Sequence, residues 1–176
     1  MWYTPHGRGQ FIVPTGVLIY QSMSGDASEG ESYFSMTNGS FKNETGCVFH
    51  VTNTTTSIDL TNVNFESTDD NFIILSADTW GNQGSNGGHA TLTLNEQEIK
   101  GNAVVNEYSS LNLILENGST YTGAVNMENS DAEINITIKD GTWTLTGDSY
   151  ISSFDGDVTS IQTDGYHLYV DGQEIA

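Results

Sequence analysis

The chain has 176 residues, of which four are Lys or Arg and 23 are Asp or Glu, so its formal net charge at neutral pH is −19. This charge excludes binding to nucleic acids or anionic membranes through a basic surface, because Arg8, Lys42, Lys100 and Lys139 are few and scattered. No apolar run has the length that a bilayer-spanning helix needs, and the single cysteine, Cys47, leaves no intrachain disulfide to form. We therefore expect no nucleic-acid partner and no membrane-embedded segment.

The N-terminal part of the sequence gives few structural signals. Residues 1–16 have little periodicity and are expected to be irregular. Val17 to Tyr20 form the first apolar run that predicts a strand, and residues 21–31 predict a polar loop punctuated by Gly25 and Gly30.

A repeated strand-and-bend pattern follows, and residues 54–67 show it most clearly. Apolar and polar residues alternate on both sides of a break at Asn62. Related segments begin near residues 33, 90, 111 and 134. Their equivalent apolar positions recur every 21 to 24 residues, with one interval of 34, at Met36, Leu60, Leu94, Leu115 and Ile138. A short repeat built from strand-length runs predicts a stacked β architecture.

Each repeat has a polar corner two residues after that apolar position. The corner residues are Asn38, Asn62, Glu96, Asn117 and Asp140. Because Asn, Asp and Gly tolerate the left-handed backbone conformation best, we expect a tight corner there, with stacked side chains that bond the backbone of the next turn. The alternative is that each Asn-Gly is an ordinary hairpin turn. Three residues later come Phe41, Phe65, Ile99 and Trp143, whereas the fourth copy has Thr120 there and its aromatic, Tyr121, one residue later.

A third apolar run completes each repeat. These runs are residues 47–51, 71–75, 103–105, 123–127 and 150–151. Three short strands per turn of roughly 21–24 residues predict an all-β parallel β-helix. We expect one domain over residues 1–176, with solenoid turns over 17–157 and a terminal strand and hairpin cap over 158–176. Asp171-Gly172 is the hairpin signal of that cap.

The long interval contains an inserted loop, residues 79–88, which is the best candidate for a binding site. An aromatic ring flanked by amides and a hydroxyl can stack on a sugar and bond its hydroxyl groups. The candidate residues are Trp80, Asn82, Gln83, Ser85 and Asn86. The alternative is that Trp80 anchors its own loop on the solenoid wall.

Calcium is the one cofactor for which the sequence offers ligands. Ca²⁺ takes six to eight oxygen ligands, and the candidates are Asp26, Asp148, Asp155 and Asp157. No EF-hand or nonapeptide calcium repeat is present, so this hypothesis depends on carboxylates alone.

Asp69, Asp70 and His89 are the only hint of catalysis. Glycosidic cleavage needs a proton donor and an activated water, which paired carboxylates can supply. The segments resemble the Asp-Asp and Gly-His elements of polygalacturonases, but no Arg follows Arg8 to complete that site. The alternative is that Asp69 and Asp70 are solvated corner residues, and we expect no catalytic residues.

Several segments resemble the large β-helical adhesin-like surface proteins of gut bacteria. They are residues 24–27, 49–54, 80–88, 144–149 and 168–172. The resemblance implies a pectate-lyase-like, right-handed β-helix that is secreted or displayed on the bacterial cell surface. Because the chain starts Met1-Trp2-Tyr3-Thr4-Pro5 without a signal peptide, we expect a fragment of a longer protein. We therefore expect a non-catalytic adhesin-like module that binds glycans or a host surface protein. A polysaccharide-active hydrolase or lyase and a purely structural spacer stay open as alternatives.

Overall fold

The computed structural model of the protein describes residues 13–21, 31–78 and 81–176. These residues fold almost entirely into β-strands, and the helical part of the described chain is one 3-10 turn at Val158–Ser160. No helix among the described residues is both long enough and apolar enough to cross a membrane. The prediction of an all-β chain is confirmed.

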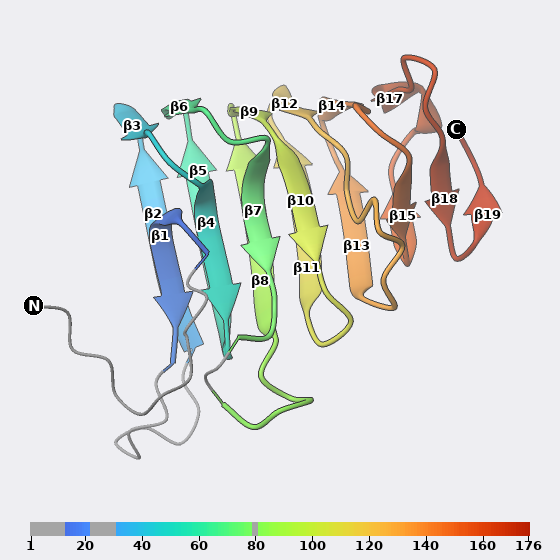
Figure 1. Ribbon diagram of the computed structural model, residues 1–176. Helices are drawn as coiled ribbons and strands as arrows, with labels where there is room; N and C mark the ends of the chain where they lie inside the picture. The colour runs from blue at the N-terminus through green and yellow to red at the C-terminus, as the bar shows by residue number, and fades with distance from the viewer. Residues whose placement is uncertain (1–12, 22–30, 79–80) are drawn as a thin grey trace, which may run out of the picture.

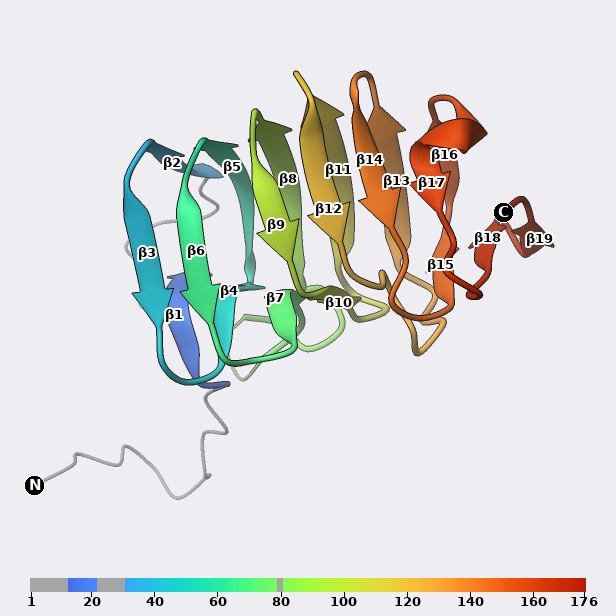
Figure 2. The same cartoon turned by 90° about the horizontal axis from the view of Figure 1, so that it is seen from above.

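The strands form three groups in which neighbours run parallel (Figures 1 and 2). The first group is β1 (Thr15–Tyr20), β4 (Cys47–Thr52), β7 (Asn71–Leu75) and β10 (Asn102–Val105). The second is β2 (Glu31–Thr37), β5 (Thr54–Thr61), β8 (Gly88–Asn95), β11 (Ser110–Glu116), β13 (Glu133–Ile138) and β16 (Ser153–Asp155). The third is β3 (Ser40–Asn43) with β6 (Asn64–Ser67), then β9 (Glu98–Lys100), β12 (Ser119–Thr122), β14 (Gly141–Thr144) and β17 (Ile161–Gln162). Nearly every strand therefore pairs with the equivalent strand of the next repeat, an arrangement compatible with a β-helix.

The strand register follows the predicted repeat in the second group. Met36 lies opposite Leu60, which lies opposite Leu94. Leu94 in turn lies opposite Leu115, and Leu115 opposite Ile138. The last four of these side chains are buried and belong to one apolar core cluster, against which Met36 packs at its edge. The repeat spacing thus places equivalent side chains in a continuous column of the core.

The predicted corners are left-handed at four of five positions. The φ angles are 60° at Asn38, 49° at Asn62, 48° at Glu96 and 52° at Asn117, whereas Asp140 is not among the residues with positive φ. The Asn62 Nδ2 amide donates to Asn38 Oδ1 at 2.8 Å, so side-chain amides do stack from turn to turn. Here the bond joins two side chains, rather than a side chain and the next backbone.

The off-by-one position in the fourth copy is explained by a longer corner. Tyr121, not Thr120, lies opposite both Ile99 and Trp143. Tyr121 comes six positions after Leu115, whereas Ile99 comes five after Leu94 and Trp143 five after Ile138, so this corner contains one extra residue. Tyr121 and Trp143 are both buried, as the repeat requires.

One predicted strand is absent and one predicted hairpin is present. Within 123–127 only Val125 makes an isolated bridge, to Ala103, because Asn126 adopts φ 53° and turns the chain. At the C-terminus β18 (Leu168–Val170) pairs with β15 (Ser149–Ile151) and forms an antiparallel hairpin with β19 (Gln173–Glu174). Asp171 and Gly172 at its turn have φ 48° and 74°, the left-handed pair that a two-residue hairpin favours.

Candidate functional site

The third strand group is interrupted between β6 and β9. β6 pairs with β3, and β9 pairs with β12, but within the described residues β6 and β9 do not pair with each other. The same two repeats are joined on the other two sides, because β5 pairs with β8 and β7 with β10. The opening is therefore local to one side of the stack.

The side chain of Gln97 bridges one end of this opening. The Val63 N–H donates to Gln97 Oε1 at 2.7 Å, and Gln97 Nε2 donates to the Val63 carbonyl at 2.8 Å. The same Nε2 donates to the Glu98 carbonyl at 2.7 Å. Gln97 is 2% exposed, so its amide satisfies backbone groups of Val63 that burial would otherwise leave unpaired.

Past Gln97, backbone groups of both strands face the opening. In a parallel pair, successive residues direct their N–H and C=O groups to opposite edges. The Asn64 N–H donates to Gly39 on the β3 side, so Phe65 and Ser67 face β9. The Gly101 N–H donates to Thr122 on the β12 side, so Lys100 faces β6. The opening closes again where the Asn102 N–H donates to the Asp70 carbonyl at 2.8 Å.

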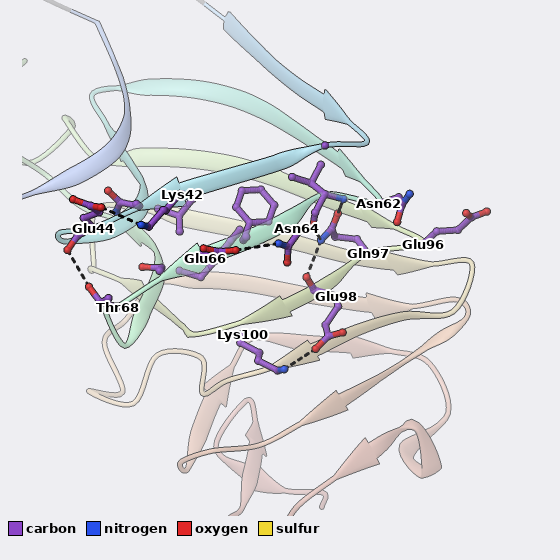
Figure 3. A pocket seen from close by; sticks show the side chains of 17 residues that line it. Lys42, Glu44, Asn62, Asn64, Glu66, Thr68, Glu96, Gln97, Glu98 and Lys100 are labelled. Atoms are coloured by element: carbon purple, nitrogen blue, oxygen red, sulfur yellow. Dashed lines mark hydrogen bonds and ion pairs between the residues drawn. The ribbon is translucent and has the colours of Figure 1, made fainter.

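A groove of about 1120 Å³ occupies this opening (Figure 3). We call it the β6–β9 groove. Its apolar lining includes Phe65, which is half-buried, and three buried side chains, Val48, Val63 and Phe72. Its polar lining comprises Lys42, Asn43, Glu44, Asn62, Asn64, Glu66, Ser67, Thr68, Glu96, Gln97, Glu98 and Lys100, together with Gly39. The groove thus joins an apolar floor, open backbone edges and a charged rim.

The rim of the groove is anionic in balance. It has four carboxylates, Glu44, Glu66, Glu96 and Glu98, and the two amines of Lys42 and Lys100. Each lysine pairs with a neighbouring carboxylate: Lys42 Nζ lies 3.1 Å from Glu44 and Lys100 Nζ lies 2.7 Å from Glu98. All four of these side chains are more than 60% exposed, so the pairs contribute little to stability.

The residues considered for catalysis are not brought together. Asp69 and Asp70 precede β7, while His89 lies at the start of β8, opposite Thr55. Strand β7 has five residues, about 16 Å of extended chain, and it separates them. Asp69 accepts the Asn71 N–H at 2.8 Å, the local turn bond of a corner aspartate.

The inserted loop is described in part, since Trp80 lies outside the described residues. Asn82, Gln83 and Ser85 are exposed, and the Ser85 N–H donates to the Asn82 carbonyl in a local turn. Asn86 is buried, and its Nδ2 donates to the Asp78 carbonyl at 2.5 Å. Asn86 therefore holds the loop in place, while the other three side chains are accessible to a ligand.

The three proposed calcium ligands that the structure describes, Asp148, Asp155 and Asp157, do not form a cluster. Across residues 13–21, 31–78 and 81–176, no three His, Cys, Asp or Glu side chains are grouped so as to hold a metal ion. Asp148 accepts the His167 N–H at 2.9 Å, and Asp155 is exposed in β16. Asp157 caps the 3-10 turn by accepting the Thr159 N–H, which lowers the pKa of that carboxyl. Asp26 lies outside the described residues, and calcium binding stays a prediction.

A second, smaller concavity of about 250 Å³ lies near the C-terminal hairpin. Tyr150 and Tyr169, from neighbouring strands, stack beside it with ring centroids 4.9 Å apart and planes 7° apart. Partial desolvation raises the pKa of Tyr169, and the negative charge of Glu174 raises it further. Asn126, Asn129 and Asp131 add polar groups to the lining. The arrangement offers aromatic surface next to amide and carboxylate groups.

The sequence interpretation missed the β6–β9 groove, although one signal was present. Gln97 follows the corner residue Glu96, and the residue after the corner is Gly39 or Val63 in the two preceding repeats. The long amide side chain of Gln97 stands where those repeats have a small or apolar residue. It marks the place where a side-chain bridge replaces the backbone pairing of β6 with β9. Comparison of the chain with protein-family models, curated proteins and solved structures finds no match.

Proposed function

We propose that the chain is a right-handed parallel β-helix with three short strands per turn. The support is the pairing of equivalent strands from successive repeats, with the left-handed corners between them. The handedness follows from the strong preference of parallel β-strand crossovers for the right-handed connection. The hairpin of β18 and β19 extends the final strand pair and acts as the cap.

We further propose that this β-helix is a non-catalytic, adhesin-like binding module of a surface or secreted bacterial protein. The observation that carries this proposal is the β6–β9 groove. Here the backbone pairing between third-group strands of successive repeats is interrupted, and an apolar floor is accessible between β6 and β9. Concave sites with an apolar lining and a few polar groups are the usual form of ligand sites.

The proposal is tested by blocking the groove. Glu66→Trp puts a large side chain on the exposed rim of the groove, and Glu133→Trp makes the same change on exposed Glu133 of β13, in an uninterrupted sheet. Binding is measured by biolayer interferometry on sensors coated with mucin or extracellular-matrix protein. We expect the wild type and Glu133→Trp to bind alike and Glu66→Trp to bind at least tenfold more weakly.

Three results would contradict the proposal. Equal binding by Glu66→Trp would remove the groove from the function, and no binding by the wild type would favour a structural spacer. Release of reducing ends or unsaturated products from polygalacturonate by the wild type would favour the enzyme instead.

Glycan binding outside the groove is a second candidate. Exposed Asn82, Gln83 and Ser85 in the inserted loop favour it, as does the Tyr150–Tyr169 stack beside its polar concavity. Amides bond sugar hydroxyls and aromatic rings pack on sugar faces. A glycan array with the wild type, Gln83→Ala and Tyr169→Ala tests this role, because loss of the same glycan signal in either variant would locate the sugar.

A further inference from the structure

We propose that the ligand of the β6–β9 groove is an extended polypeptide segment, which binds as an added β-strand and alternates apolar with basic residues. This inference rests on the proposed function, since it names the partner of the same groove. It starts from the backbone groups that the interruption leaves open.

Both walls of the groove are open strand edges. The N–H and C=O groups of Phe65 and Ser67 face the groove from β6, and those of Lys100 face it from β9. Within the described residues no hydrogen bond joins these backbone groups to another part of the chain. An open edge is a template for a further strand, because its donors and acceptors repeat at the spacing of a peptide backbone. A segment lying in the groove would meet such groups on two sides.

The floor determines the inward side chains of the added strand. Alternate residues of a strand point to opposite faces of the sheet, so every second residue of the ligand faces Val63, Phe65 and Phe72. Phe65 is only partly buried, although the equivalent Tyr121 and Trp143 of later repeats are fully covered. An apolar ligand residue would therefore cover surface of Phe65 that the third strand group leaves open.

The rim determines the outward side chains. Glu66 and Glu98 project from β6 and β9 on the exposed face of the groove (Figure 3), so outward ligand residues would lie between two carboxylates. Lysine or arginine complements that charge, and the chain's net charge of −19 attracts basic segments over a longer range. A glycan would meet the side chains of this rim, but its hydroxyls do not reproduce the regular alternation of backbone donors and acceptors.

The ligand class is identified by selecting a displayed library of random heptapeptides on the wild-type chain, after depletion on Glu66→Trp. Enriched peptides are synthesised and titrated by fluorescence polarisation. We expect enriched sequences to alternate apolar with basic residues. N-methylation of alternate backbone amides in the best peptide should weaken its binding at least tenfold, because it removes the donors that face one edge.

Variants of the protein test the β9 wall and the rim separately. Lys100→Pro removes the groove-facing N–H, and Lys100→Ala removes the same charge while keeping that N–H. We expect at least fivefold weaker peptide binding by Lys100→Pro than by Lys100→Ala. The double variant Glu66→Gln/Glu98→Gln should weaken binding about fivefold and reduce its dependence on salt.

The inference is overturned if no groove-dependent peptide is enriched, if N-methylation has no effect, or if Lys100→Pro and Lys100→Ala bind alike. A glycan-array signal that Glu66→Trp abolishes, without any peptide binding, would overturn this inference and leave the proposed function standing. If neither peptides nor glycans respond to Glu66→Trp, both the inference and the proposed function fail.

Discussion

Strand β9 has two edges, and they differ. On one edge β9 pairs with β12: the Thr120 N–H donates to the Gln97 carbonyl at 2.8 Å, and the Gly101 N–H donates to Thr122 at 2.9 Å. On the other edge β9 faces β6, and the contact between the two strands there is made by the Gln97 side chain. On this side of the stack, backbone pairing therefore joins β9 to β12, whereas the buried Gln97 amide links β9 to the residue before β6.

An aromatic cluster lies on the β6 side of the interrupted boundary, contributed by β3, β4, β6 and β7. Phe65 and Phe72 meet edge to face, with centroids 5.2 Å apart and planes 90° apart. Phe49 packs on Phe72 at 5.6 Å, and Phe41 lies 5.8 Å from Phe65. Aromatic pairs of this geometry add about 0.5–1.5 kcal/mol each beyond burial. The comparison teaches that a β-stack can lose one ladder where the other two continue and a buried amide bridges the gap.

Proline substitutions at the two edges of β9 should give the largest difference in unfolding free energy. Thr120→Pro removes an N–H that bonds β9, so we expect unfolding free energy to fall by about 3 kcal/mol. Lys100→Pro removes an N–H that faces the groove, so its cost should stay below about 1 kcal/mol. Urea unfolding followed by circular dichroism measures both, and a cost for Lys100→Pro equal to that of Thr120→Pro would contradict the open edge.

Removal of the bridging amide should weaken the interrupted boundary itself. Gln97→Ala leaves the Val63 N–H and C=O buried without partners, at a cost of about 2–3 kcal/mol. Gln97→Met keeps the length of the side chain without its hydrogen bonds, and we expect it to lose nearly as much stability. If Gln97→Met unfolded like the wild type, the amide would not be what joins Val63 to β9.

Substitutions at two equivalent corners should differ less in their cost to stability. Asn62 holds a left-handed backbone, φ 49°, whereas Asp140 at the equivalent corner does not. We expect Asn62→Ala to cost about 1–2 kcal/mol, because Ala tolerates that conformation poorly and the amide bond to Asn38 is lost. Asp140→Ala should cost less than about 0.5 kcal/mol. Thermal unfolding of both variants checks the difference, and equal costs would mean that backbone strain is not what selects Asn.

The smallest effect concerns pH and the uninterrupted first sheet. His50 of β4 is buried beside Ser76, and burial lowers the pKa of its imidazole, with Asp78 opposing. Because the folded state holds the neutral form, stability should be full above about pH 6.5 and fall as the pH drops below the ordinary histidine value. His50→Gln should reduce the loss of stability between pH 7.5 and 5.5. An unchanged slope in that variant would assign the pH dependence to other groups.

Much of the fold could be predicted because the type of residue at each position of the repeat depends on its local environment, either the apolar core or a left-handed corner. Leu60, Leu94 and Leu115 lie in the expected register since the same inward position is apolar in each turn. Asn62 and Asn117 are left-handed because few other residues tolerate that corner. The prediction failed at 123–127, where an apolar run around Val125 is turned by Asn126 rather than paired as a strand.

The candidate site could not be predicted in the same way. The loop amides Asn82 and Gln83 were recognisable from composition, and they are exposed as a binding role needs. The groove exists only because β6 and β9 do not pair. The sequences of both segments predict strands whether or not the two strands pair with each other. Only the contact of Gln97 with Val63, over 34 residues of chain, distinguishes the two outcomes.

The most direct test of the open edges is amide hydrogen exchange of the unliganded protein, resolved by residue with NMR. Paired amides such as those of Thr120 and Gly101 should exchange slowly, as ladder bonds protect them. The amides of Phe65, Ser67 and Lys100 should exchange at least about a hundredfold faster than those neighbours. Slow exchange at Phe65 and Lys100, matching that of Thr120, would show that β6 and β9 are paired and would contradict the account.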